Sequence, residues 1–325
     1  MKSKTLDSKK LIALIVGAVV LLALPLVLPN YALLILSFWE IYIIAVSGLD
    51  LVFGYCGQIS LGHAAFYAIG AYGSGMLHEY LGIPVFFTMI IAAFISAGVG
   101  ALIAYPSSKL VFHFLSLASQ AFGEIVYLLV SHSPGKITGN YQGFFSDYIN
   151  LFGFELDTYT SFYYFGLVCV LVFLVIKTFM VKSKTGRAFT AIRENSHAAD
   201  GMGINVRKYK VIAFTVSAFY TAYAGAMYLH LTKFINPDTF VLKQSVMFLT
   251  MLLFGGSGCL LGPVLGSFVV LLVNEVLRAL QDYQMFVYGI LLLIVVVAMP
   301  GGLYGEVMRL VNFIKGKATK KAEVK

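Results

Sequence analysis

The segment from 53 to 73, FGYCGQISLGHAAFYAIGAYG, places polar side chains and glycines inside a long apolar stretch. Gln58, Ser60 and His63 carry amide, hydroxyl and imidazole groups that donate and accept hydrogen bonds. A bilayer offers no water to such groups, so each must be paired within the protein or line a wet cavity. Two interpretations are open: the three side chains line a passage, or they bond neighbouring helices together. No partner ligands stand at a useful spacing from His63, so we expect no metal site.

Four carboxylates lie within or near the ends of the apolar stretches, namely Glu40, Asp50, Glu124 and Glu275. An acid inside a membrane-spanning segment is a candidate for a functional site. Glu124 lies deep in its stretch and is the candidate for a passage, with a structural bond to a neighbouring helix as the alternative. The other three lie close to the expected ends of spans, where we expect water to solvate them.

The composition indicates a polytopic membrane protein of the all-α class. Of the 325 residues, 59% are hydrophobic and 12% are charged, whereas a soluble domain carries about a quarter charged residues. The mean hydropathy is +0.87. The net charge of +8 comes from basic residues clustered at both ends and in one central segment. Such clusters are typical of cytoplasmic loops, so we expect contact with membrane lipid and no nucleic-acid partner.

About twenty apolar residues are needed to cross a bilayer as a helix, and the sequence offers about ten such stretches. The expected spans are 11–28, 31–53, 62–78, 83–105, 109–131, 161–181, 211–231, 245–261, 264–281 and 284–300. The third and the ninth are short and rich in glycine, which predicts broken or re-entrant helices. The first is too long for a signal-peptide core and has no small-x-small cleavage site, so we expect an uncleaved helix.

The distribution of basic residues predicts the orientation. They concentrate in the tail 1–10, the segment 182–210 and the tail 315–325, whereas the loop 132–160 holds one basic and three acidic residues. The positive-inside rule therefore places both termini and 182–210 in the cytoplasm and 132–160 outside. Six spans before the central segment and four after it agree with this parity, which gives one transmembrane domain over 11–314.

Motifs of catalysis are missing from the sequence. It contains no G-x-x-x-x-G-K-[ST], G-x-S-x-G or H-E-x-x-H, so neither an ATP-binding P-loop nor a hydrolase site is expected. Transport is the remaining functional class, with no cofactor, and its energy must come from partner subunits or from an ion gradient.

The central segment predicts a short helix over 187–202. Phe189, Ile192 and Ala199 recur at helical spacing, and Gly201 and Gly203 then interrupt the pattern. The helix is either a connector whose charges set the topology or an element that docks into a partner.

This segment, GRAFTAIRENSHAADGMGIN, strongly resembles the cytoplasmic coupling segment of branched-chain amino acid ABC permeases of the LivM type. Within it, His197-Ala198-Ala199-x-x-x-Gly203 matches the E-A-A-x-x-x-G core of bacterial import permeases, with His in place of Glu. The resemblance implies that ATPase subunits dock here. The implied coupling residues are Arg187, Arg193, Glu194, Ala198, Ala199 and Gly203.

Further motifs of the same family follow in the expected order between about Ser47 and Glu275. They are GYCGQISLGHAAFYAIGAY, LASQAFGEIVYLL, ITGNYQG, SAFYTAYAGAMY and LLFGGSGCLLGPVLGS. The resemblance implies a translocation core formed around Gln58, Ser60, His63, Glu124, Gly255 and Gly258. For the glycines, close helix packing is the alternative role.

The resemblance also implies a function and a set of partners. We expect a permease subunit of an importer for branched-chain amino acids in the bacterial cytoplasmic membrane. Its partners would be a LivH-type second permease, two ABC ATPase subunits and an extracytoplasmic binding protein. A urea or short-amide permease of similar sequence and a stand-alone ion-coupled carrier are the alternatives.

Overall fold

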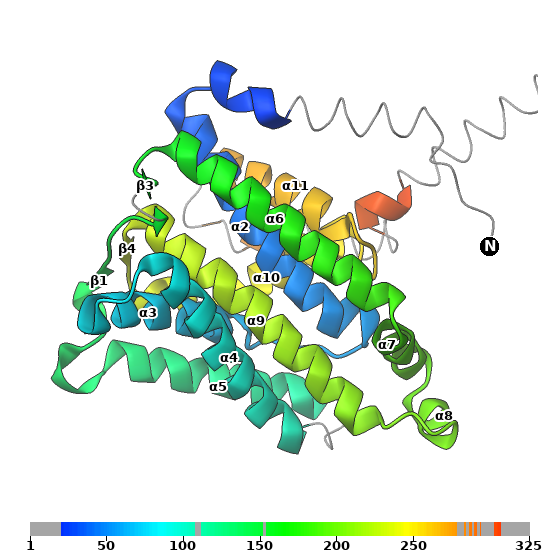
Figure 1. Ribbon diagram of the computed structural model, residues 1–325. Coiled ribbons are helices and arrows are strands. Elements are labelled where there is room, and N and C mark those ends of the chain that lie inside the picture. The colour runs from blue at the N-terminus through cyan, green and yellow to red at the C-terminus, as the bar shows by residue number, and fades with distance from the viewer. Residues whose placement is uncertain are drawn as a thin grey trace, which may run out of the picture.

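In the computed structural model, the described residues are 21–107, 112–151, 154–277 and 302–306, together with 283, 286, 287, 289, 290 and 293. Most of them are helical (Figure 1). The expected tails 1–10 and 315–325, and most of the expected spans 11–28 and 284–300, lie outside the described residues.

Four helices are long and apolar enough to cross a membrane. They are α2 (Asn30–Asp50, extended to Tyr55 by the π-helix η1, Leu51–Tyr55), α4 (Val85–Ser107), α6 (Tyr159–Lys182) and α9 (Val206–Thr232). The other spans correspond to α3 (His63–Leu81), α5 (Phe112–Ser131), α10 (Leu242–Gly255) and α11 (Gly262–Val276). The prediction of an all-α polytopic membrane protein is therefore confirmed, and the ninth span is short, as expected. The third span, by contrast, is one continuous helix of 19 residues.

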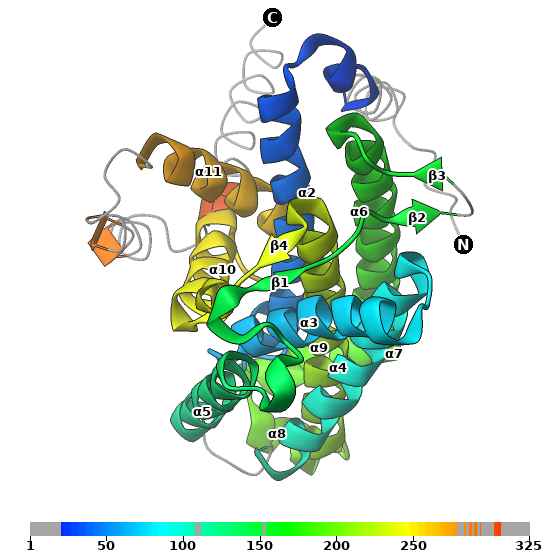
Figure 2. The same cartoon turned by 90° about the vertical axis from the view of Figure 1, so that its left-hand side faces the viewer.

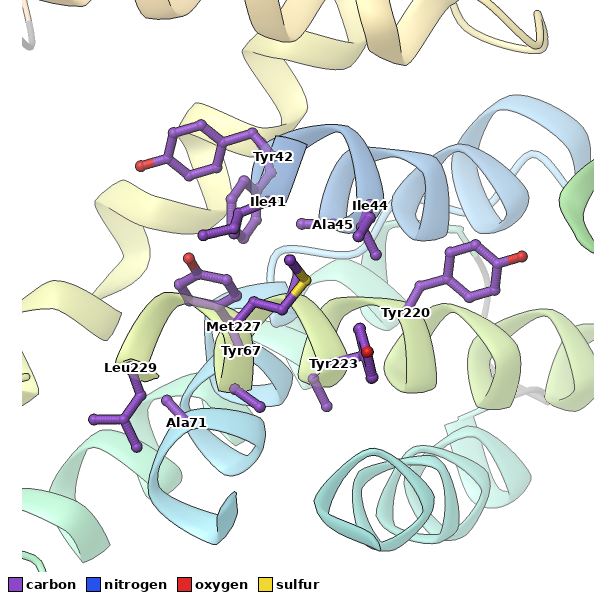
Figure 3. Close-up of a cluster of buried hydrophobic side chains, with 14 of the residues drawn as sticks. Ile41, Tyr42, Ile44, Ala45, Tyr67, Ala71, Tyr220, Tyr223, Met227 and Leu229 are labelled. Carbon is purple, nitrogen blue, oxygen red and sulfur yellow. The ribbon is translucent and has the colours of Figure 1, made fainter. Parts of the chain in front are cut away.

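Helix α9 lies at the centre of the bundle and packs against α2, α3 and α4 (Figure 2). Figure 3 shows the apolar side chains that meet there, including Ile41 and Ile44 of α2, Tyr67 of α3 and Met227 of α9. All four side chains are completely buried. Small residues allow the helix backbones to approach closely, since a Cβ atom on Gly70 of α3 would lie 1.8 Å from the Ala222 oxygen.

Short strands mark one end of the bundle, which we call the strand end. Strand β1 (Phe144–Phe145) pairs antiparallel with β4 (Phe234–Ile235), and β2 (Asn150–Leu151) pairs with β3 (Phe154–Glu155). Three 3-10 turns lie near them: η2 (Pro134–Lys136), η3 (Asn140–Gln142) and η4 (Pro237–Phe240). The expected loop 132–160 thus folds over this end of the helices.

The opposite end carries two short helices, α7 (Lys184–Glu194) and α8 (Ser196–Gly201), as Figure 1 shows. We call it the basic end, because the Lys- and Arg-rich segment 182–210 lies there. The expectation of one helix over 187–202 is wrong, since the backbone breaks at Asn195. The Asn195 Oδ1 atom accepts hydrogen bonds from the His197 and Ala198 amides, both at 3.0 Å, and so starts a new helix as an N-cap.

Candidate functional site

A loop over residues 56–62 separates η1 from α3 and lies among the side chains of the bundle. Serine hydroxyls from α5 and α10 satisfy the backbone in and beside this break: Leu61 N donates to Ser119 Oγ (3.0 Å), Ser116 Oγ to Ile59 O (3.2 Å), and Ala64 N to Ser245 Oγ (2.8 Å). Irregular backbone at membrane depth is tolerated only where protein or a wet cavity supplies such partners. Helices α5 and α10 thus converge on the break.

His63 connects the same break to the central helix α9. Its ring is fully buried, with Nδ1 3.1 Å from Ser60 Oγ and Nε2 2.7 Å from Ser217 Oγ. Gln58 is 3% exposed, and its Oε1 atom is without a hydrogen-bond partner among the described residues. His63 therefore bonds α3 to α9 in this conformation, with Ser60 on its other ring nitrogen, and a passage role for the three residues stays a prediction.

The predicted glycines Gly255 and Gly258 belong to a helical hairpin made of α10, the turn 256–261 and α11. A Cβ atom on Gly255 would lie 1.8 Å from the Gly262 oxygen, so the two helices meet backbone to backbone. Gly258 has φ +75°, a left-handed conformation that favours glycine, and its N–H donates to Asp50 Oδ1 at 2.7 Å. The hairpin is thereby joined to the end of α2.

Asp50 forms a buried ion pair with Lys177 of α6, with 2.8 Å between Oδ2 and Nζ and both side chains fully buried. The expectation that water solvates Asp50 is therefore wrong. Sequence reasoning missed Lys177, although a lysine inside the expected span 161–181 was a signal, because charges within spans normally find a partner.

The other two acids that we expected at solvated ends are Glu40, which is buried, and Glu275, which is hydrogen-bonded within the protein. Glu40 is 4% exposed and packs against α6, where a Cβ atom on Gly166 would lie 2.1 Å from its Oε2. It borders an apolar cavity of about 350 Å³ between α2, α6 and α11. Glu275 accepts a hydrogen bond from the Tyr31 hydroxyl. The expectation that water solvates Glu40 is therefore wrong. Glu275 has a protein partner in addition to any water.

Glu124 lies apart from the buried residues, with its side chain exposed on α5. Exposed apolar residues flank it on the same helix, including Leu117 and Leu128. One turn further on, the Tyr127 hydroxyl donates to Asp238 at 3.2 Å. The structure thus brings Gln58, Ser60 and His63 together but leaves Glu124 on an outer face. Among the described residues, no cluster of three or more His, Cys, Asp or Glu side chains is arranged to hold a metal.

The predicted coupling residues divide into an outer and an inner group. Arg187, Glu194 and Ala198 are exposed, whereas Ala199 is 3% exposed and packs within the chain. Gly203 has φ +84° and open space around it.

Arg193 is partly exposed and points back into the protein. Its Nη1 atom donates to the Gly54 carbonyl at 2.6 Å, while Nη2 lies 2.9 Å from Glu194 Oε1. Arg193 and Ala199 both contact the chain's own residues, and their predicted role in coupling stays a prediction.

Comparison with known proteins finds sequence similarity over most of the chain. Residues 31–296 match the family model described as "Branched-chain amino acid transport system / permease component". The chain is 30% identical to the high-affinity branched-chain amino acid transport system permease protein LivM of Escherichia coli K12, over 90% of this chain and 74% of that protein. It is 24% identical to a probable LivM of Methanocaldococcus jannaschii, over 84% and 93% of the two chains. It is 26% identical to the E. coli K12 permease LivH, over 82% and 91%. No solved structure matches.

Proposed function

Since the chain belongs to the family of branched-chain amino acid transport permease components, we propose that it is the membrane-spanning permease subunit of an ABC importer that moves leucine, isoleucine and valine. The names of its LivM and LivH relatives support this substrate class. The absence of a P-loop motif from the sequence supports ATP hydrolysis on separate subunits. A second, LivH-type permease and an extracytoplasmic binding protein complete the proposed assembly.

One observation carries the proposal, namely the helix pair α7–α8 at the basic end. Phe189 and Ile192 bury one face of α7 against the bundle, and Arg187, Glu194 and Ala198 leave the other side of the pair open. A short element that is fixed on one side and exposed on the other suits docking of a cytoplasmic subunit. We assign α7–α8 as the ATPase-docking element.

The proposed orientation in the membrane rests on the different charges of the two ends of the bundle. The basic segment 182–210 and the acidic loop 132–160 lie at opposite ends of the bundle (Figure 1). Basic loops remain in the cytoplasm, so we propose that the basic end is cytoplasmic and the strand end external. Cytoplasmic termini and residence in the bacterial cytoplasmic membrane belong to this proposal.

The exposed face of α5 is proposed to be covered in the assembled transporter. An unpaired carboxylate facing lipid is costly, by about 2.5–3.5 kcal/mol for an acid at the centre of a span. Glu124 on the outer face of α5 therefore supports the proposal that a second permease or a wet passage covers this face.

Uptake of labelled leucine and labelled urea in a strain that lacks this gene tests the substrate class. We expect the gene to restore uptake of leucine but not of urea, and only when the ATPase subunits carry an intact P-loop lysine. Uptake of urea alone would move the assignment to an amide permease. Leucine uptake that is indifferent to the P-loop lysine would indicate an ion-coupled carrier.

A further inference from the structure

Four elements meet around Asp50, and only two of them, α6 and α7, are neighbours in the sequence. They are the end of α2 with η1, helix α6 through Lys177, helix α7 through Arg193, and the α10–α11 turn through Gly258. We call Asp50, Gly54, Lys177, Arg193 and Gly258 the Asp50 junction. It joins the proposed docking element to the helical hairpin.

The Asp50 carboxylate uses its two oxygens for two different elements. Oδ2 accepts from Lys177 Nζ at 2.8 Å, and Oδ1 accepts from the Gly258 amide at 2.7 Å. Both charged side chains are fully buried. Because Gly258 lies in the turn of the hairpin, a shift of the end of α2 changes the position of that turn or breaks the hydrogen bond.

Arg193 connects α7 to the same point. Its Nη1 atom donates to Gly54 O at 2.6 Å, and a Cβ atom on Gly258 would lie 2.9 Å from that Nη1. On Gly54, a Cβ atom would lie 2.3 Å from the Gly258 amide nitrogen. Gly57 is equally close, since its Cβ would lie 2.8 Å from Arg193 Cγ. The arginine stem, the end of α2 and the hairpin turn are therefore in direct contact, with no room for an additional side chain.

The junction is poorly explained by stability alone. Replacing a buried ion pair by apolar groups of similar size is often neutral or stabilising, because desolvating both charges cancels much of their attraction. The chain nevertheless keeps the pair beside a π-helix, a feature that is frequent at functional sites. The pair with Lys177 holds the Asp50 side chain in place, so that its second oxygen meets the Gly258 amide.

We propose that the Asp50 junction transmits movement of the docking helix α7 to the α10–α11 hairpin, with Asp50 and Arg193 as positioning residues. The inference rests on the proposed function, in which ATPase subunits move α7. The movement passes from Arg193 to the end of α2 and from Asp50 to the hairpin. Loss of the junction uncouples ATP hydrolysis from transport without releasing the ATPases.

Two double variants separate the hydrogen bond to Gly258 from the charge pair. Asp50→Asn with Lys177→Met removes both charges but keeps an Oδ1 acceptor for the Gly258 amide. Asp50→Leu with Lys177→Met removes that acceptor at nearly the same side-chain volume. In both variants the methionine replaces the lysine, so no unpaired ammonium is buried and the main cost to folding is avoided.

The complete transporter, with second permease, ATPases and binding protein, is purified and placed in liposomes for each variant. ATP hydrolysis and leucine uptake are measured in the same preparation. We expect the Asn variant to keep its uptake per ATP within about twofold of wild type. We expect the Leu variant to retain its ATPases and hydrolyse ATP, with uptake per ATP lowered about tenfold, within the range of known coupling effects.

Equal uptake per ATP in the two variants, whether both normal or both low, would overturn the proposal, because only one of them keeps the bond to Gly258. If the Leu variant does not reach the membrane, Arg193→Lys and Arg193→Met decide instead. Lysine can still donate to Gly54 O and should preserve coupling, whereas methionine should uncouple. Wild-type coupling in the methionine variant would refute the junction's role. Failure of the proposed function is distinguishable, because the wild-type complex itself would then show no ATP-dependent leucine uptake.

Discussion

Single residues decide whether the exposed face of α5 has a role in transport. Glu124 is exposed on a membrane helix, where its charge needs a wet or protein-covered surrounding. We predict that Glu124→Gln lowers leucine uptake by about tenfold with little change in abundance, because charged hydrogen bonds contribute about 1.5–3 kcal/mol. Uptake and immunoblots of the same membranes measure both quantities. Glu79→Gln, an exposed acid near the end of α3, is the matched control. Normal uptake by the Glu124 variant would show that its charge has no role.

Adjacent alanines of α8 provide a second test at the scale of residues. Ala198 is exposed, whereas Ala199 is 3% exposed and packs against the chain's own core. Ala198→Trp should give an abundant membrane protein that fails to retain its ATPases on mild detergent purification. Ala199→Trp should also lose abundance, since overpacking a core costs about 1–3 kcal/mol or more. A full ATPase complement bound to the Ala198 variant would contradict the docking assignment.

The close contact between helices α3 and α9 can be tested at a single glycine. A Cβ atom on Gly225 of α9 would lie 2.0 Å from the Tyr67 oxygen of α3, whereas Gly98 of α4 has open space around it. We predict that Gly225→Val separates α3 from α9 and abolishes a monodisperse peak in size-exclusion chromatography, while Gly98→Val leaves the peak intact. If both variants elute like wild type, the close approach of α3 and α9 is not required for folding.

Hydropathy and charge predicted the helices well, because each span must satisfy its own backbone within lipid. Eight of the ten expected spans coincide with helices in the described part of the chain. The break at Asn195 was missed, although an asparagine before a polar turn is a typical N-cap signal. The partners of Asp50 could not be predicted, since Lys177 lies 127 positions away and Gly258 lies 208 positions away in the sequence.

The candidate site could be predicted only in part, because residue types indicate burial but not the partners across helices. The polarity of Ser60 and His63 marked the loop 56–62 correctly as shielded by protein. The partner of His63 on α9 and that of the Leu61 amide on α5 depend on how the helices pack, which periodicity does not specify. An arginine in a charged segment is typical of a surface residue. Only the structure shows that Arg193 also donates a hydrogen bond to the Gly54 carbonyl inside the protein.

At the scale of the whole molecule, the orientation is the first property to test. Cysteines are introduced at exposed Gln142 of the strand end and at exposed Thr190 of the basic end, in a chain whose native cysteines Cys56, Cys169 and Cys259 are replaced by alanine. We predict that an impermeant thiol reagent labels position 142 in intact cells and position 190 only after the membrane is opened. Labelling of both positions from the same side would refute the six-plus-four arrangement of spans.

Under the proposed function, this chain forms the passage of an ATP-driven importer for branched-chain amino acids. The most direct measurement is leucine uptake into liposomes that contain the chain, its second permease and both ATPases, with binding protein outside and ATP inside. We predict uptake that requires ATP, stops when the P-loop lysine of the ATPases is replaced, and is unaffected by collapsing ion gradients. Leucine uptake by this chain alone, driven by an ion gradient and independent of ATP, would contradict the account.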